Sequence, residues 1–289
     1  MILDDHIFLP IYQCVGEPVK SKEAAMTQKK INFEKLYRSL ESPEKWKAFR
    51  QEQIADVAGD INRAKCEKFS DYMTDQFINT CNDKEIAGRF KNWEQKSDSE
   101  KLKLASDIVR IFLQNIKSDI AGHRVPFYEQ DAGESFKTNE ASSKGVDANM
   151  PEIPTISIKP MPNDKADGTS MMYVSNNKDL CININHPVYK QSPAEFLADL
   201  RHELTHVIDM FIPELSPLDK DVREKSVMFY VNAKENSELY KNNPLELNAN
   251  TKRQEYKQYI EAMLVMQTIN QNRVQNMNFL NMGLRGLGR

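Results

Sequence analysis

Long apolar runs are missing from this chain of 289 residues, in which no stretch approaches the roughly 18 consecutive apolar residues that a membrane helix needs. The N-terminus carries Asp4 and Asp5 where a secretory signal would carry Lys or Arg, and Pro10 interrupts its apolar stretch. We therefore expect no membrane partner and no ordinary export signal. The protein is expected in the cytoplasm, or as an effector exported by a dedicated secretion system.

Cysteine is scarce as well. The chain contains Cys14, Cys66, Cys81 and Cys181, with no C-x-x-C pair among them. This scatter predicts free thiols in a reducing compartment rather than disulfides or a zinc knuckle.

An excess of positive charge is also absent, because the formal net charge is −3 at pH 7. Binding to nucleic-acid phosphates requires a basic surface that this balance does not supply, so we expect no nucleic-acid partner. Hydrophobic residues make up 40% of the chain, which is enough for a substantial core. No feature of the sequence indicates an oligomeric state.

Histidine is rare too, yet two of the five histidines lie four residues apart, as His202 and His206, with Glu203 between them. On an α-helix this spacing places both imidazoles on one face, where they can bind one metal ion. Two imidazoles leave room for one more protein ligand and a water, as in a catalytic zinc site. Glu203 is then placed to act as general base on that water. The simpler alternative is a core helix whose histidines are only hydrogen-bonded.

The flanking residues predict that this motif lies on a helix from Ser192 to Ile212. Ser192 is suited to the N-cap, Pro193 to the first helical position, and Glu195 to closing a capping box with Ser192. Pro213 is expected to end the helix. Apolar residues recur at helical spacing and predict one buried side: Phe196, Leu200, Leu204, Val207, Ile208 and Phe211.

The rest of the pattern predicts an α+β fold in three parts. Residues 1–121 read as a helical N-terminal domain, with helices predicted near 31–40, after Ser42 and after Ser97, and 122–154 as a loop or linker. Residues 155–289 read as a small-sheet domain that ends in a long polar helix from about Thr251 to Leu280. Three short strands are expected before the motif helix, the last two as a hairpin: 155–159, 170–175 and 180–185.

Strands followed by a helix bearing the pentapeptide HELTH make residues 155–260 resemble a zincin metallopeptidase of the gluzincin branch. The resemblance covers about a third of the chain. It implies a Zn²⁺ cofactor, a third ligand Glu on a later helix, and hydrolysis of a protein or peptide substrate by a metal-activated water. The strand at 170–175 or that at 180–185 would offer an edge on which an extended peptide can lie.

Glu246 is the preferred third ligand. Asn243 can cap a helix and Pro244 suits its first position, so Glu246 would project from the first turn of a rigid element. The resemblance implies that the residue four positions later orients the first histidine. That residue is Asn250, where the related enzymes carry Asp. The other downstream candidates are Glu214, Glu224, Glu235, Glu238 and Glu255.

Two other zincin patterns fit less well. A metzincin would carry Gly at 209 and His at 212, where this chain has Asp209 and Ile212. Asp209 could itself serve as an Asp ligand, but its position one turn past His206 suits a supporting role behind the metal better.

An oxyanion donor is not obvious, because no histidine follows His206. Tyr230, Tyr240 and Tyr256 are the candidate substitutes.

Three rival interpretations remain open. The first is a metal-bearing or degenerate zincin-fold interaction module with little turnover. The second is a helical adaptor with a coincidental motif. The third is a deformylase-like amide hydrolase, which would need a Cys ligand, but Cys181 lacks the flanking motifs of such enzymes.

Overall fold

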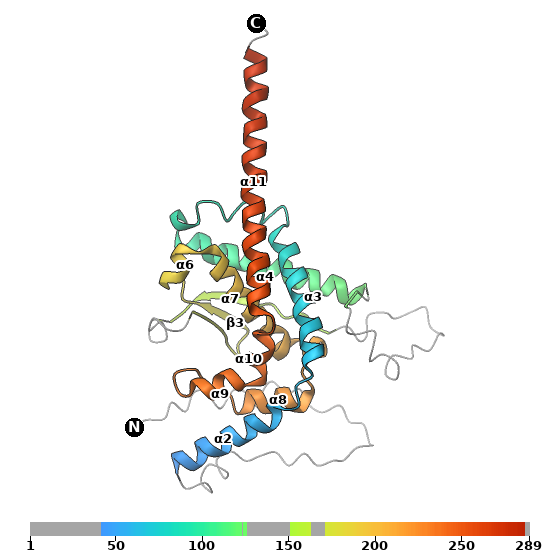
Figure 1. Cartoon of the computed structure of the whole chain (residues 1–289), viewed down its shortest axis with the longest axis vertical. Coiled ribbons are helices and arrows are strands. Elements are labelled where there is room, and N and C mark those ends of the chain that lie inside the picture. The colour runs from blue at the N-terminus through green and yellow to red at the C-terminus, as the bar shows by residue number, and fades with distance from the viewer. Residues whose placement is uncertain (1–41, 123, 126–150, 163–170, 287–289) are drawn as a thin grey trace, which may run out of the picture.

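A computed structural model of the chain describes residues 42–122, 124–125, 151–162 and 171–286. The helix predicted near 31–40 and most of the predicted linker lie outside these residues. Figure 1 shows that the described chain is mainly helical, with one small sheet. The longer helices are α2 (Pro43–Ala58), α3 (Arg63–Cys81), α4 (Asp98–Ala121), α7 (Pro193–Phe211), α8 (Lys220–Met228) and α11 (Arg253–Gly286). The short ones are α6 (Pro187–Gln191), α9 (Ser237–Asn242), α10 (Pro244–Ala249) and the 3-10 turns η2 (Trp93–Gln95) and η3 (Pro213–Leu215).

The predicted caps set where the first helices begin. The Ser42 side chain accepts a hydrogen bond from Lys45 N at the start of α2. At the start of α4, Ser97 and Glu100 form both halves of the capping box, each side chain bonding the other residue's backbone N–H. These bonds satisfy backbone donors that have no partner inside the helix.

The sheet has the strand order β1 (Ser157–Pro160), β3 (Asp179–Ile182), β2 (Met172–Val174). β1 runs parallel to β3, and β2 pairs with β3 in antiparallel register, which confirms the predicted hairpin. Because β3 is bonded on both sides, the strand predicted at 180–185 offers no free edge. Of the two strands proposed as peptide-binding edges, only β2 lies at an edge of the described sheet.

One hydrophobic core joins the two halves of the sequence. Buried residues of α3 and α4, such as Phe77 and Phe112, belong to the same cluster as Ile182, Leu204 and Ile260. The described part of the predicted N-terminal domain therefore packs on the second half instead of enclosing a core of its own. Amphipathic helices give no sequence signal of which partner covers their apolar faces, so the pattern suggested a separate bundle.

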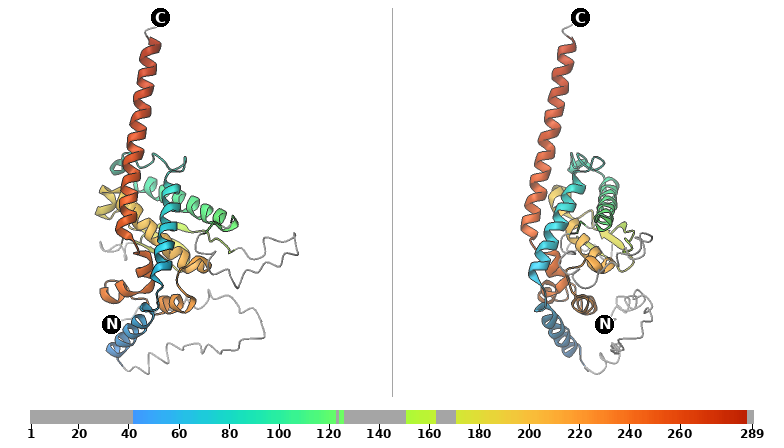
Figure 2. Two further views of the ribbon diagram at one scale, coloured as in Figure 1. Left: turned by 45° about the vertical axis from the view of Figure 1, so that its right-hand side comes forward. Right: turned by 90° about the vertical axis from the view of Figure 1, so that its right-hand side faces the viewer.

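The last helix, α11, packs beside α7 and α3 and then extends well beyond the rest of the molecule, as both views in Figure 2 show. No helix in the described part of the chain combines the length and apolar character that crossing a bilayer requires. Several large apolar side chains of α11 are exposed: Tyr259, Val265, Met266 and Ile269.

Candidate metal centre

Helix α7 carries the two histidines into the interior. The Ser192 side chain caps it by accepting from Glu195 N at 3.3 Å, but the Glu195 side chain pairs with Lys257, so only half of the predicted capping box forms. His202 and His206 are both buried on one face of α7. Their Nε2 atoms approach to 3.1 Å. The two imidazoles thus point at one common position.

Glu246 reaches the same position from α10. The Asn243 side chain caps α10 by accepting from Leu245 N at 2.9 Å, and its own amide donates to Ser226 O, also at 2.9 Å. These bonds fix the first turn of α10, in which Glu246 is 1% exposed. Its Oε2 lies 3.4 Å from Nε2 of His202, and its Oε1 lies 3.3 Å from Nε2 of His206. The three residues form a buried group that can hold a metal ion.

The separations of these ligand atoms fit a small tetrahedral cation. Bonds of about 2.0–2.1 Å at tetrahedral angles place neighbouring ligand atoms about 3.3–3.4 Å apart. The two Nε2 atoms lie 3.1 Å apart, and each is 3.3–3.4 Å from a different oxygen of Glu246. With one ligand atom taken from each residue, the three atoms lie within 4.8 Å of one another, so a small rearrangement of the carboxylate would bring one oxygen to the tetrahedral distance. Moreover, the buried Oε2 of Glu246 and Nδ1 of His202 have no hydrogen-bond partner among the described residues. A buried carboxylate oxygen that lacks a hydrogen bond and lies 3.4 Å from an imidazole nitrogen is suited to a cation.

The charges at the centre are strongly coupled. Burial disfavours ionisation of Glu246, but hydrogen bonds and charge from His202 and His206 outweigh it and hold the pKa of Glu246 well below its usual value. Burial lowers the pKa of His202. Burial also opposes protonation of His206, yet the hydrogen bond and charge of Glu246 raise the pKa of His206 to about 9. Without a metal, a proton on His206 therefore occupies the position that suits a cation.

Glu203 lies beside this group on α7 and is 8% exposed. Burial raises its pKa to about 7; the negative charges of Glu246 and Asp199 act in the same direction, while His206 opposes them. No described residue donates a hydrogen bond to its carboxylate. A carboxylate with a pKa near neutrality can exchange a proton with water at physiological pH.

Two of the three candidate tyrosines approach the centre. The Tyr230 hydroxyl donates to Oε1 of Glu246 at 2.9 Å. The Tyr240 ring lies perpendicular to that of Tyr230, with centroids 6.1 Å apart. Burial, followed by the charge of Glu246, raises the pKa of both phenols. Both therefore stay protonated and can donate hydrogen bonds at the centre.

Tyr256 is not part of the centre, which corrects its assignment as an oxyanion donor. Its ring packs under Arg201, whose guanidinium carbon is 4.2 Å from the ring centroid, and its hydroxyl accepts from Arg253 at 3.3 Å. At 1% exposure, Tyr256 is a core residue that joins α11 to α7.

Asn250 does not orient His202, which is a second correction. Helix α10 ends at Ala249, so Asn250 occupies the C-cap, where its side-chain amide donates to the backbone carbonyl of Glu246 at 2.9 Å. The same carbonyl also accepts from the backbone N–H of Asn250 at 2.9 Å, so the side chain adds a second hydrogen bond at the end of α10.

Asp209 lies one turn past His206 on α7, and its predicted supporting role stays a prediction. It is fully buried and accepts hydrogen bonds from Ser216 Oγ at 2.5 Å and from Asn248 Nδ2 at 2.9 and 3.2 Å. Its charge contributes to raising the pKa of His206. Asn248 was not predicted. It lies two residues after Glu246 and ties α10 to α7 from within.

A second group missed from sequence surrounds Asp199, one turn before Glu203 on α7. Asp199 pairs with Arg253 through one oxygen and accepts from the Tyr189 hydroxyl at 2.7 Å through the other. Arg253 is thereby held against α7 one turn before Glu203, and its charge opposes the rise that burial causes in the pKa of Glu203. In the sequence, the four-residue spacing of Asp199 and Glu203 could have indicated that Asp199 lies on the same face of α7 as Glu203.

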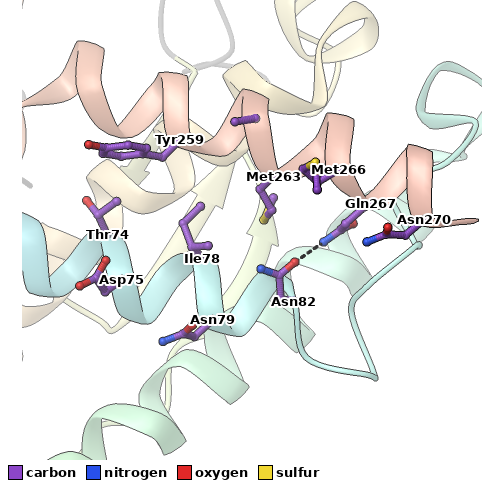
Figure 3. A pocket seen from close by; sticks show the side chains of 11 residues that line it. Thr74, Asp75, Ile78, Asn79, Asn82, Tyr259, Met263, Met266, Gln267 and Asn270 are labelled. Carbon is purple, nitrogen blue, oxygen red and sulfur yellow. Dashed lines mark hydrogen bonds between the residues drawn. The ribbon is translucent and has the colours of Figure 1, made fainter.

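A groove of about 680 Å³ lies away from this centre, between α3 and α11. Figure 3 shows Ile78 of α3 and Met263 and Met266 of α11 among its lining residues, together with the hydrogen bond between Asn82 and Gln267. None of its lining residues belongs to the metal centre.

The chain matches no protein-family model, no curated protein and no solved structure.

Proposed function

We propose that this protein is a zinc-dependent metallopeptidase. The observation that carries the proposal is the convergence of His202, His206 and Glu246 on one buried position, with Glu203 beside it. Two imidazoles and one carboxylate form a ligand set suited to zinc, and three protein ligands leave a fourth position open for water or substrate.

Each residue then has a defined role. Zinc held by this set supplies Lewis acidity that activates water and polarises a carbonyl oxygen. Glu203 takes a proton from the attacking water and passes it to the leaving amine, so water gives its hydroxyl to the acyl carbon as the C–N bond breaks. Tyr240, and Tyr230 once its hydroxyl turns away from Glu246, would donate hydrogen bonds to the carbonyl oxygen as negative charge develops on it.

We expect an extended peptide substrate to bind along the edge strand β2. α7 packs directly against β2, and β2 is an edge strand of the described sheet. An extended peptide can pair with such an edge through its backbone, which brings one carbonyl over α7.

Glu203→Gln tests this function. The variant keeps the size of the side chain but cannot accept the proton, so hydrolysis of a peptide library should fall by about 10²–10⁴-fold while the zinc content stays at one ion per chain. Glu238→Gln, at an exposed glutamate of α9, serves as the matched control. Unchanged hydrolysis in Glu203→Gln, or protein purified without stoichiometric zinc, would contradict the proposal.

A second candidate function is a metal-bearing interaction module. The groove between α3 and α11 and the exposed apolar side chains of α11, both apart from the metal centre, favour it. In that case zinc would be bound, no peptide would be cleaved, and Glu203→Gln would change nothing measurable.

A further inference from the structure

Arg253 of α11 pairs with Asp199, which lies one turn before Glu203 on α7. Burial lowers the pKa of His202 and the charge of Arg253 adds to this effect, whereas burial raises the pKa of Glu203 and of Tyr240 and the charge of Arg253 opposes it. Its side chain is 28% exposed, so solvent reaches part of it.

The guanidinium of Arg253 is held in place by only some of its N–H donors. One Nη donates to Asp199, which the Tyr189 hydroxyl fixes from the other side, and the other Nη donates to the Tyr256 hydroxyl. A guanidinium has five N–H groups, so three of them have no partner among the described residues. Arginine presents such donors in a planar fork that matches the two oxygens of a carboxylate.

The position of Arg253 along α7 sets a length scale. Asp199 precedes Glu203 by one turn, so the anchor of the guanidinium lies about 6 Å from the general base along the helix axis. One residue of extended peptide spans about 3.3–3.6 Å. A carboxylate bound at Arg253 is therefore one or two residues away from a carbonyl beside Glu203. The edge strand β2 is also short, Met172–Val174, and suits a short length of bound peptide.

We propose that Arg253 binds the free C-terminal carboxylate of a peptide, so that one or two residues are removed from that end of the substrate. This inference rests on the proposed function for the cleavage, but the recognition itself is a property of Arg253. Asp199 and Tyr189 are positioning residues that hold the guanidinium beside the centre.

Peptide binding separates recognition from cleavage. The zinc-loaded Glu203→Gln protein is immobilised and offered an equimolar library of N-acetylated pentapeptides, synthesised both as free acids and as C-terminal amides. Retained peptides are identified by mass spectrometry. A charge-assisted hydrogen-bonded contact should enrich acids over amides by roughly tenfold or more. Adding Arg253→Gln should abolish the enrichment, and Arg253→Lys should reduce it, because lysine keeps the charge but lacks the fork.

Lys257→Gln is the matched control. Lys257 lies one turn further along α11, has the same 28% side-chain exposure, and also pairs with an acid of α7, Glu195. Its loss should leave the preference for acids intact. Zinc content and melting temperature establish that each variant is folded, and Arg253→Lys decides the question should Arg253→Gln fail to fold.

The outcomes are distinct. Equal retention of acids and amides, or a preference that survives Arg253→Gln, overturns the inference, even if the wild-type protein cleaves peptides internally. A preference that depends on Arg253 supports the inference. If the wild-type protein then shows no hydrolysis, the proposed peptidase function fails while the carboxylate site stands.

Discussion

The Tyr230 hydroxyl donates a hydrogen bond of 2.9 Å to Oε1 of Glu246, the same oxygen that lies 3.3 Å from Nε2 of His206. A donor bonded to a metal ligand is already beside the position where a substrate carbonyl would be polarised. Its acidity is suppressed by burial and by the Glu246 charge, so it remains a donor. Under the proposed function, Tyr230 is thus the phenol that we expect to stabilise the oxyanion.

Tyr230→Phe should lower kcat by about 10²–10³-fold, the usual cost of losing one oxyanion donor. Zinc content and folding should be retained, because the ring remains and Glu246 keeps its contacts with both histidines. Steady-state kinetics on a cleaved peptide measure the effect, with Tyr259→Phe, at an exposed position of α11, as the control. A change in KM alone would instead assign Tyr230 to substrate binding.

Glu246→Gln should weaken zinc binding by at least about 100-fold, more than the 10–100-fold cost of losing an outer hydrogen-bond partner. The amide has the same size but lacks the negative charge that holds the two imidazoles and the cation together. Competition with a chelator measures the affinity. Wild-type affinity in this variant would mean that another acid completes the ligand set.

Zinc binding should release about one proton per ion at pH 7. The pKa of His206 is about 9 in the metal-free protein, so its ring is protonated at neutral pH and must lose that proton to become a ligand. The apparent zinc affinity should therefore rise about tenfold per pH unit up to about pH 9 and level off above it. Calorimetry in buffers of different ionisation enthalpy counts the protons. Release of no proton at pH 7 would show that the His206 ring is already neutral.

The local parts of the site followed from the sequence. The spacing of His202 and His206 fixes their shared face on any helix, and Ser192 with Pro193 sets where that helix begins. Glu246 could be predicted for a similar reason, because Asn243, three residues earlier, caps α10 and Pro244 is its first residue. Short-range helical geometry determines all of these features.

Contacts between distant segments did not follow from the sequence. Asn248 meets Asp209, and Arg253 meets Asp199, only because α10 and α11 pack on α7, and no spacing rule encodes those pairs. Asn250 was misassigned because α10 ends one residue before it. At this C-cap position, its side-chain amide donates to the backbone carbonyl of Glu246. The prediction of an N-terminal helical domain likewise did not anticipate that α3 and α4 share a core with α7 and α11.

Glu203→Gln should stabilise the metal-free protein at pH 8 by roughly 1–3 kcal/mol. Burial raises the pKa of Glu203 in the folded state to about 7 from the ordinary value of 4.5. The folded state therefore binds a proton more tightly than the unfolded state, and this contribution to stability is present below pH 4.5 and lost as pH rises through 7. The advantage of the variant should shrink between pH 8 and pH 5. Urea unfolding in the presence of chelator measures it, and a pH-independent difference would contradict the raised pKa.

Arg50→Met should impair catalysis although Arg50 lies on α2, outside the metal centre. Its guanidinium donates to the backbone carbonyl of Tyr230 and to Glu235 at 2.8 Å, and so holds the loop between α8 and α9 that presents the Tyr230 phenol. Removing these bonds should lower stability by about 1–3 kcal/mol. It should also reduce kcat in the same direction as Tyr230→Phe, while zinc stays bound.

The control for Arg50 is Lys47→Met, which removes an exposed cation one turn earlier on the same helix. A double-mutant cycle with Tyr230→Phe tests the coupling. If Arg50 acts by placing the phenol, its loss should cost little further kcat once the hydroxyl is gone, because the two changes remove the same contribution. Additive losses would show that α2 affects the centre by a route other than Tyr230.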